Sequence, residues 1–126
     1  MADNLDPELR ELQIDYLKDV QETAEVLRKH GKHLAGRNQF KTSFPVLLFM
    51  SHQLKGSGGS LGFPKISELA QQISVALNQY LEDDTAPRLT PQELSLSVVG
   101  YSDLLAASVR ESRAALLEVK RALHVK

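Results

Sequence analysis

The chain has 126 residues, of which 42% are apolar, enough to bury one hydrophobic core but not clearly two. Its 15 basic and 16 acidic residues leave a net charge of −1, which gives no electrostatic footprint for nucleic acid or for an anionic membrane. The absence of cysteine excludes disulfides and thiolate metal sites, and the longest apolar run, residues 44–50, is too short to span a membrane. Because the acidic N-terminus also lacks the apolar core of a secretory signal, we expect one cytoplasmic domain over residues 1–126.

The first predicted helix begins at Asp6-Pro7-Glu8. The aspartate can cap free amide groups, proline fits the first turn, and glutamate is favourable at the positive end of a helix. Gly31 and Gly36 weaken the far end, and residues 37–39 are predicted to form a turn. Apolar residues recur between these limits at helical spacing: Leu9, Leu12, Ile14, Tyr16, Leu17, Val20, Ala24, Leu27 and Leu34.

A second long helix is predicted to start near Thr42-Ser43, with Pro45 in its first turn, and to run to about Leu61. Gly62 can adopt the left-handed conformation that ends helices, and Pro64 then opens a third helix after a very short connection. Short connections make neighbouring helices antiparallel. The apolar stripe of the third helix is Ile66, Leu69, Ala70, Ile73, Leu77 and Leu81.

Residues 82–89 are predicted to form a loop, after which Thr90-Pro91-Gln92-Glu93 combines a capping box with proline at the first helical position. The last helical stretch covers residues 91–124, and Gly100 leaves open whether it is one helix or two. The prediction is an all-α protein, an antiparallel four-helix bundle with room for one additional short helix. The last apolar stripe is Leu94, Val98, Tyr101, Leu105, Val109, Leu116, Val119 and Leu123.

The run from His52 to Phe63 carries the most informative residues. With His52 at 0° on a helix, Lys55 lies near about −60°, Gly56 near about +40° and Gly59 near about −20°. These four residues therefore share one side of the second helix, and we expect His52 to be exposed. The residues predicted to face the core on the other side are Leu47, Met50, Leu54 and Leu61.

This side suits a phosphoryl group that moves onto and off an imidazole. A neutral imidazole keeps one nucleophilic ring nitrogen near neutral pH, and the Lys55 ammonium can pair with phosphoryl oxygens. Three glycines within a helix cost about 2–3 kcal/mol relative to alanine, so Gly56 and Gly59 are predicted to provide clearance for a partner. Leu48 and Phe49 lie on either side of His52 and are candidates for an apolar docking rim, although packing against neighbouring helices is equally compatible.

The run resembles the histidine-containing phosphotransfer (HPt) domains of bacterial-type phosphorelays. The motif covers about a dozen residues, and the helical layout extends the resemblance over most of the chain. The family pattern is a histidine, an apolar residue, lysine, glycine, small residues and a closing glycine. Its matches in this chain are His52, Leu54, Lys55, Gly56, Ser57, Gly59, Leu61 and Gly62.

The resemblance implies a helical bundle in which His52 takes a phosphoryl group from an aspartate of a receiver domain and passes it to another receiver. It implies no kinase activity and no cofactor of the domain's own, because the receiver contributes the acidic pocket and its magnesium ion. Lys55 would supply charge beside the phosphate. Gln71 and Ser74 are candidates for the polar residue that orients the histidine ring from the next helix.

Other polar clusters have simpler interpretations. His30 and His33 are spaced to share a helix face, but no third metal ligand is apparent, so we expect surface histidines and no metal site. Glu82-Asp83-Asp84 lacks the glycine-turn spacing of a calcium loop and is predicted to be a solvated loop. The phosphate-binding glycine loop of nucleotide hydrolases is absent, so we expect no ATPase activity.

Three functions are compatible with this pattern. The first is a phosphorelay carrier between receiver domains of response regulators or hybrid histidine kinases, phosphorylated on His52. The second is a module that binds receivers without transferring phosphate. The third is the phosphoacceptor domain of a chemotaxis-type histidine kinase. Only the first uses both a donor and an acceptor receiver, and the sequence identifies neither of them.

Overall fold

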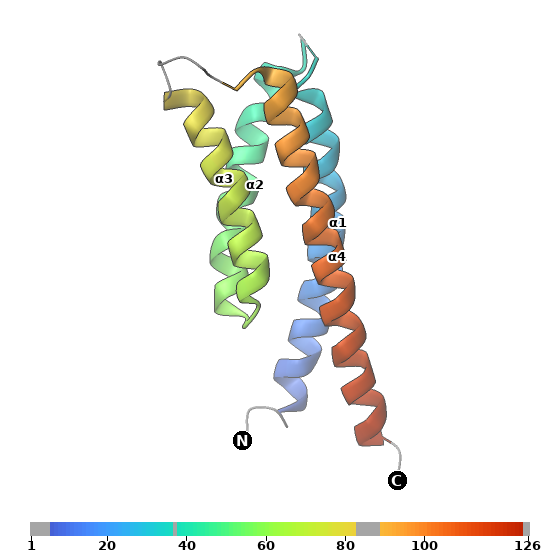
Figure 1. Cartoon of the computed structure of the whole chain (residues 1–126). Helices are drawn as coiled ribbons and strands as arrows, with labels where there is room; N and C mark the ends of the chain where they lie inside the picture. The colour runs from blue at the N-terminus through green and yellow to red at the C-terminus, as the bar shows by residue number, and fades with distance from the viewer. Residues whose placement is uncertain (1–5, 37, 83–88, 125–126) are drawn as a thin grey trace.

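The computed structural model describes residues 6–36, 38–82 and 89–124. Within these residues the chain forms four helices, with no strand and no further helix: α1 (Pro7–His33), α2 (Phe40–Ser60), α3 (Pro64–Glu82) and α4 (Pro91–His124). Figure 1 shows the four helices side by side in a bundle, with α1 and α4 running beyond the end of the α2–α3 hairpin. The predicted all-α four-helix bundle is confirmed, and residues 91–124 form one continuous helix.

The predicted start signals of α1 and α4 are confirmed. The Asp6 carboxylate accepts hydrogen bonds from the backbone N–H groups of Glu8 (3.0 Å) and Leu9 (3.3 Å). At the start of α4, the Thr90 N–H donates to the Glu93 carboxylate (2.9 Å) and the Glu93 N–H donates to the Thr90 hydroxyl (3.1 Å). These are local interactions between residues close in sequence, which is why the sequence pattern predicts them.

The connection between α2 and α3 is as short as predicted. Gly62 has a φ of +88°, the left-handed conformation expected at the end of α2. The Phe63 N–H donates to the Gly58 carbonyl (2.7 Å) and the Gly62 N–H to the Gly59 carbonyl (3.3 Å), which satisfies the last carbonyl groups of the helix. Residues 61–63 thus turn the chain tightly and place α3 directly alongside the helix that carries His52.

The helix α2 begins at Phe40, about one turn earlier than the predicted start near Thr42-Ser43. The reason is tertiary packing, since the Phe40 ring stacks on Phe44 at a centroid distance of 5.3 Å and lies 5.4 Å from the Tyr80 ring of α3. The extra turn brings Phe40 into this aromatic cluster. Pro45 consequently lies in the second turn rather than the first.

The core occupies the centre of the bundle, and the predicted stripes supply it with a few exceptions. Leu12 and Leu81 are 60% and 53% exposed, so they do not belong to the core. Val119 and Leu123 are 46% and 45% exposed because the last turns of α4 extend past the end of the α2–α3 hairpin, which therefore does not pack against them (Figure 1). The fully buried large side chains are Leu17, Val20, Leu27, Leu34, Leu47, Ile66, Ile73, Leu77, Leu94, Val98, Leu105 and Val109.

The far end of α1 is more firmly packed than the glycine pattern predicts. Gly31 is buried inside the helix, and a Cβ atom there would lie 2.9 Å from the Val98 side chain of α4. The Ser95 hydroxyl donates to the Gly31 carbonyl at 2.7 Å. Gly31 therefore permits a close approach of α1 and α4 instead of ending the helix, which continues to His33.

His30 and His33 are half-buried, which corrects the prediction of surface histidines. Their Nδ1 atoms lie 2.9 Å and 3.3 Å from the hydroxyl oxygen of Ser43, a buried residue of α2. Burial, and then the positive charges of His33 and Lys29, lower the pKa of His30 from its ordinary value of 6.5. The pair therefore links α1 to α2 most favourably when His30 is neutral.

We expect this link to make folding stability depend on pH. Because the pKa of His30 is lower in the folded chain, the unfolded chain binds more protons as the pH falls below about 6.5. The free energy of unfolding should therefore decrease between about pH 7 and pH 5, as measured by urea denaturation. The variant His30→Gln should show a shallower decrease, and an equally steep decrease in that variant would assign the effect to other groups.

Candidate functional site

His52 and its predicted neighbours lie on the outer side of α2. His52, Lys55, Gly56 and Gly59 are all exposed, as the helical rotation predicts. Neither His52 nor Lys55 makes a side-chain hydrogen bond or ion pair with another described residue. The imidazole and the ammonium group are thus both available to a molecule that approaches from solvent.

The three glycines of this segment have different surroundings. A Cβ atom at Gly56 would meet nothing within 4 Å, and one at Gly59 would have only the Ser67 hydroxyl, at 3.9 Å. A Cβ atom at Gly58 would lie 2.9 Å from the backbone nitrogen of Ser67 and 3.1 Å from Cγ2 of Ile66. Gly56 and Gly59 therefore leave open space beside His52, whereas Gly58 allows α2 and α3 to pack closely.

The buried side of α2 is shifted from the position that the sequence predicts. Leu47 and Leu54 are buried as expected, but Met50 and Leu61 are only half-buried. Because Phe44, Ser51 and Gly58 are also buried, the buried arc centres roughly 130° from His52 instead of directly opposite. His52 consequently leans toward the α3 side of the outer surface.

The contacts of α3 with α2 fix the register of this antiparallel pair. The Ser67 hydroxyl donates to the Lys55 carbonyl at 2.7 Å, and the Phe44 and Tyr80 rings are 6.1 Å apart. Interpolation between the Gly58–Ser67 and Phe44–Tyr80 contacts places residues 72 and 73 level with His52. Ser67 was not predicted from the sequence, because nothing in its local pattern indicates that it contacts α2.

Gln71 and Ser74, the candidate ring-orienting residues, flank that level on α3 and are both half-buried. Within the described residues neither of them hydrogen bonds to His52. The Asn78 side-chain amide donates to the carbonyl and the hydroxyl oxygen of Ser74, at 3.0 Å and 3.3 Å. Their orienting role stays a prediction.

The two candidates for an apolar rim lie in different environments. Leu48 is half-buried and packs against the hydrophobic core. Phe49 is 62% exposed, one turn before His52 on the outer side of α2. Phe49 is therefore the candidate that offers apolar surface to a docking protein.

On its other side α2 is anchored to α1. The Tyr16 and Ser57 hydroxyl oxygens are 2.7 Å apart, and the Gln13 amide donates to the Leu61 carbonyl at 3.0 Å. Burial raises the pKa of Tyr16, whose ring also stacks on Phe63 at 6.0 Å. The sequence pattern treats Tyr16 only as an apolar stripe residue, yet its hydroxyl helps to hold the half of α2 that follows His52.

The described residues contain no group of three or more histidine, cysteine, aspartate or glutamate residues placed to hold a metal ion. Glu82 is the last residue of α3 rather than part of a loop, and Asp83 and Asp84 lie outside the described residues. None of the helices over the described ranges is both long and apolar enough to cross a membrane. The outer side of α2 therefore remains the best-supported site.

Comparison with known proteins identifies the family of the chain. No curated protein and no solved structure matches the chain significantly. A protein-family model described as "Hpt domain" matches residues 11–122 of the 126 residues, a range that contains His52 and the greater part of the bundle. The chain therefore belongs to the Hpt domain family, the histidine phosphotransfer domains of two-component signalling.

Proposed function

We propose that this protein is a phosphorelay carrier that accepts a phosphoryl group on His52 from the aspartate of one receiver domain and passes it to a second receiver. Hpt domains interact with receiver domains of response regulators or kinases. The observation that carries the proposal is an exposed imidazole without a partner among the described residues, flanked by Lys55 and by the open positions Gly56 and Gly59. A cytoplasmic location, where the chain would meet its receivers, is part of the proposal.

The transfer needs only one nucleophile from this chain. A ring nitrogen of neutral His52 forms a bond to phosphorus while the phosphorus–oxygen bond to the receiver's aspartate breaks, and the aspartate leaves as a carboxylate. The other ring nitrogen keeps its proton during the step. The reverse exchange with a second receiver regenerates neutral His52 and an aspartyl phosphate.

Lys55 lies one turn after His52 on the same side of α2 and keeps its ammonium group exposed. A phosphoryl group on His52 carries negative charge, and a charge-assisted hydrogen bond from Lys55 would stabilise it. Gly56 and Gly59 would let the receiver's backbone approach the imidazole closely, because no side chain stands beside it at these positions.

The proposal is tested with two purified receiver domains from the source organism. One receiver is phosphorylated with labelled phosphate, freed of its donor, and mixed with this chain, and the second receiver is then added. The expected result is an acid-labile, base-stable label on this chain, followed by a base-labile label on the second receiver. Binding of receivers without any label on the chain, over all receivers of the organism, would instead indicate a binding module without transfer.

A second prediction concerns Lys55→Ala. Because Lys55 is exposed and its side chain makes no hydrogen bond or ion pair in the described structure, the free energy of unfolding should change by less than about 0.5 kcal/mol. Transfer from a phosphorylated receiver should slow by about tenfold or more, since a charge-assisted hydrogen bond contributes about 1.5–3 kcal/mol. Rapid-quench kinetics measures the rate, and Lys55→Arg, which keeps the charge, should restore part of it. Loss of folding in Lys55→Ala would contradict the assignment of this residue to the exposed side.

A further inference from the structure

The net charge of this chain is near zero, but its acidic and basic residues are strongly segregated along the sequence. No aspartate or glutamate occurs between Glu25 and Glu68, although the chain has 16 acidic residues. The first 25 residues alone hold eight of those 16. The stretch without acidic residues contains seven of the 15 lysines and arginines: Arg28, Lys29, Lys32, Arg37, Lys41, Lys55 and Lys65.

All of α2 lies within this stretch, so the helix that carries His52 has no carboxylate of its own. Lys41 is exposed and stands 11 residues before His52. That separation is about 20° more than three full turns, so Lys41 lies on the same side of α2, about 16 Å along the axis. Lys41 and Lys55 therefore bracket His52 with positive charge along one line.

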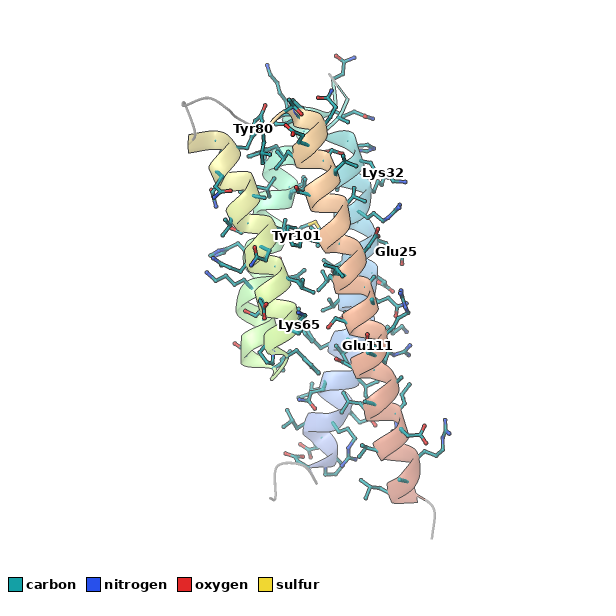
Figure 2. All side chains as sticks on the ribbon, in the orientation of Figure 1. Glu25, Lys32, Lys65, Tyr80, Tyr101 and Glu111 are labelled. Carbon is teal, nitrogen blue, oxygen red and sulfur yellow. The ribbon has the colours of Figure 1, made fainter. Side chains whose placement is uncertain are left out.

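The acidic part of α1 does not share this face. On α1 the exposed Asp19 lines a groove with Gln53 and Ser57 of α2, whereas Glu25 projects from the side of α1 that faces away from α2 (Figure 2). The Tyr16–Ser57 and His30–Ser43 contacts set the register and place residues 21 and 22 of α1 level with His52. The α2 residues that contact α1, Ser43 and Ser57, lie about 140–180° around the helix from His52, so the positive His52 face is turned away from the acidic part of α1.

Along α1 the charge changes from negative to positive. Two residues labelled in Figure 2 mark this change: Glu25 is the last carboxylate of the acidic segment, and Lys32 lies farther along the same helix, toward the α1–α2 turn. On α3, Lys65 lines a groove with Glu111 of α4, so its charge lies on the side of α3 that faces α4 (Figure 2). The positive charge along the His52 face of α2 therefore comes from Lys41 and Lys55.

We infer that this face selects and orients a receiver domain whose phosphoaspartate is flanked by an acidic surface, which pairs with Lys41. The inference rests on the proposed function and specifies the chemistry of the partner. Charges at this distance act on the rate and the orientation of encounter more than on the affinity of the final complex. Lys41 is thus a specificity residue that does not touch the reacting atoms.

The test compares two charge reversals with equal effect on net charge. Lys41→Glu changes the proposed docking face, and Lys18→Glu, an exposed lysine within the acidic part of α1, is the matched control. Both variants should fold, and a glutamate in the first turn of α2 is favourable at the positive end of that helix. The probe is the phosphorylated receiver that labels the wild-type chain fastest in the relay assay.

Stopped-flow association at about 0.02 M salt should be about threefold to tenfold slower for Lys41→Glu and within about twofold of wild type for Lys18→Glu. At about 0.5 M salt the difference should disappear, because screening shortens the range of the interaction. Equal association rates for the two variants would overturn the inference, and so would a slowing in Lys41→Glu that salt does not reduce. In either case, normal labelling of His52 would leave the proposed function in place. A wild-type chain that no receiver labels would overturn both.

Discussion

The variant His52→Gln is expected to lose phosphorylation completely, to below about 1% of the wild-type label, because an amide nitrogen is not a nucleophile at neutral pH. The loss should be the same with a phosphorylated receiver and with phosphoramidate, a small donor that needs no docking surface. His52 is exposed and has no hydrogen bond to another described residue, so the free energy of unfolding should change by less than about 0.5 kcal/mol. The measurement is the amount of acid-labile phosphate per chain.

The matched control is His33→Gln, which removes another imidazole from the same chain. His33 is half-buried beside Ser43 and lies far from the open glycines, so its replacement should leave the label on His52 intact. Comparable labelling of His52→Gln and wild type would show that the phosphoryl group resides elsewhere. Loss of label in both variants, with both folded, would contradict the assignment of a single acceptor.

The second large effect is expected from Gly58→Ala, which should lower the free energy of unfolding by about 1–3 kcal/mol. The added methyl group would lie 2.9 Å from the backbone nitrogen of Ser67 and 3.1 Å from Ile66, so α2 and α3 would have to separate. Backbone atoms cannot rotate away as the end of a flexible side chain can. Thermal and urea denaturation of the two proteins measure the difference directly.

The matched control in the same helix is Gly56→Ala, for which the sign should reverse. A Cβ atom at Gly56 meets nothing within 4 Å, so alanine should raise the free energy of unfolding by about 0.5–1 kcal/mol through its better helix propensity. Destabilisation by both substitutions would mean that α2 needs glycine at Gly56 for reasons of folding. Stabilisation by Gly56→Ala would instead support the view that this glycine is kept for access to His52.

Much of this structure follows from signals between residues close in the chain. Asp6, Thr90 and Glu93 cap their helices through contacts over two or three residues, and Gly62 ends α2 by its own left-handed conformation. The exposure of His52 follows from helical rotation within α2 alone. Each of these features depends on residues within one or two turns, so the sequence pattern is sufficient to predict it.

The features that the pattern missed depend on residues far apart in the chain. Phe40 joins α2 because the Tyr80 ring lies beside it, and Gly31 continues α1 because Val98 packs against it. His30 and His33 are half-buried because Ser43 of another helix bonds to both rings. A periodic pattern shows which residues can face inward but does not show what stands opposite each of them.

For the site, the sequence alone determines that His52, Lys55, Gly56 and Gly59 share one side of a helix, because rotation per residue is a local property. The same rotation turns Gly58 toward the interior. Only the tertiary structure decides that this side leans toward α3 and that Gly58 packs against Ser67 and Ile66 of α3. Those facts arise from the register between antiparallel helices, which is set by contacts such as Tyr16–Ser57 and Phe44–Tyr80 rather than by any one segment.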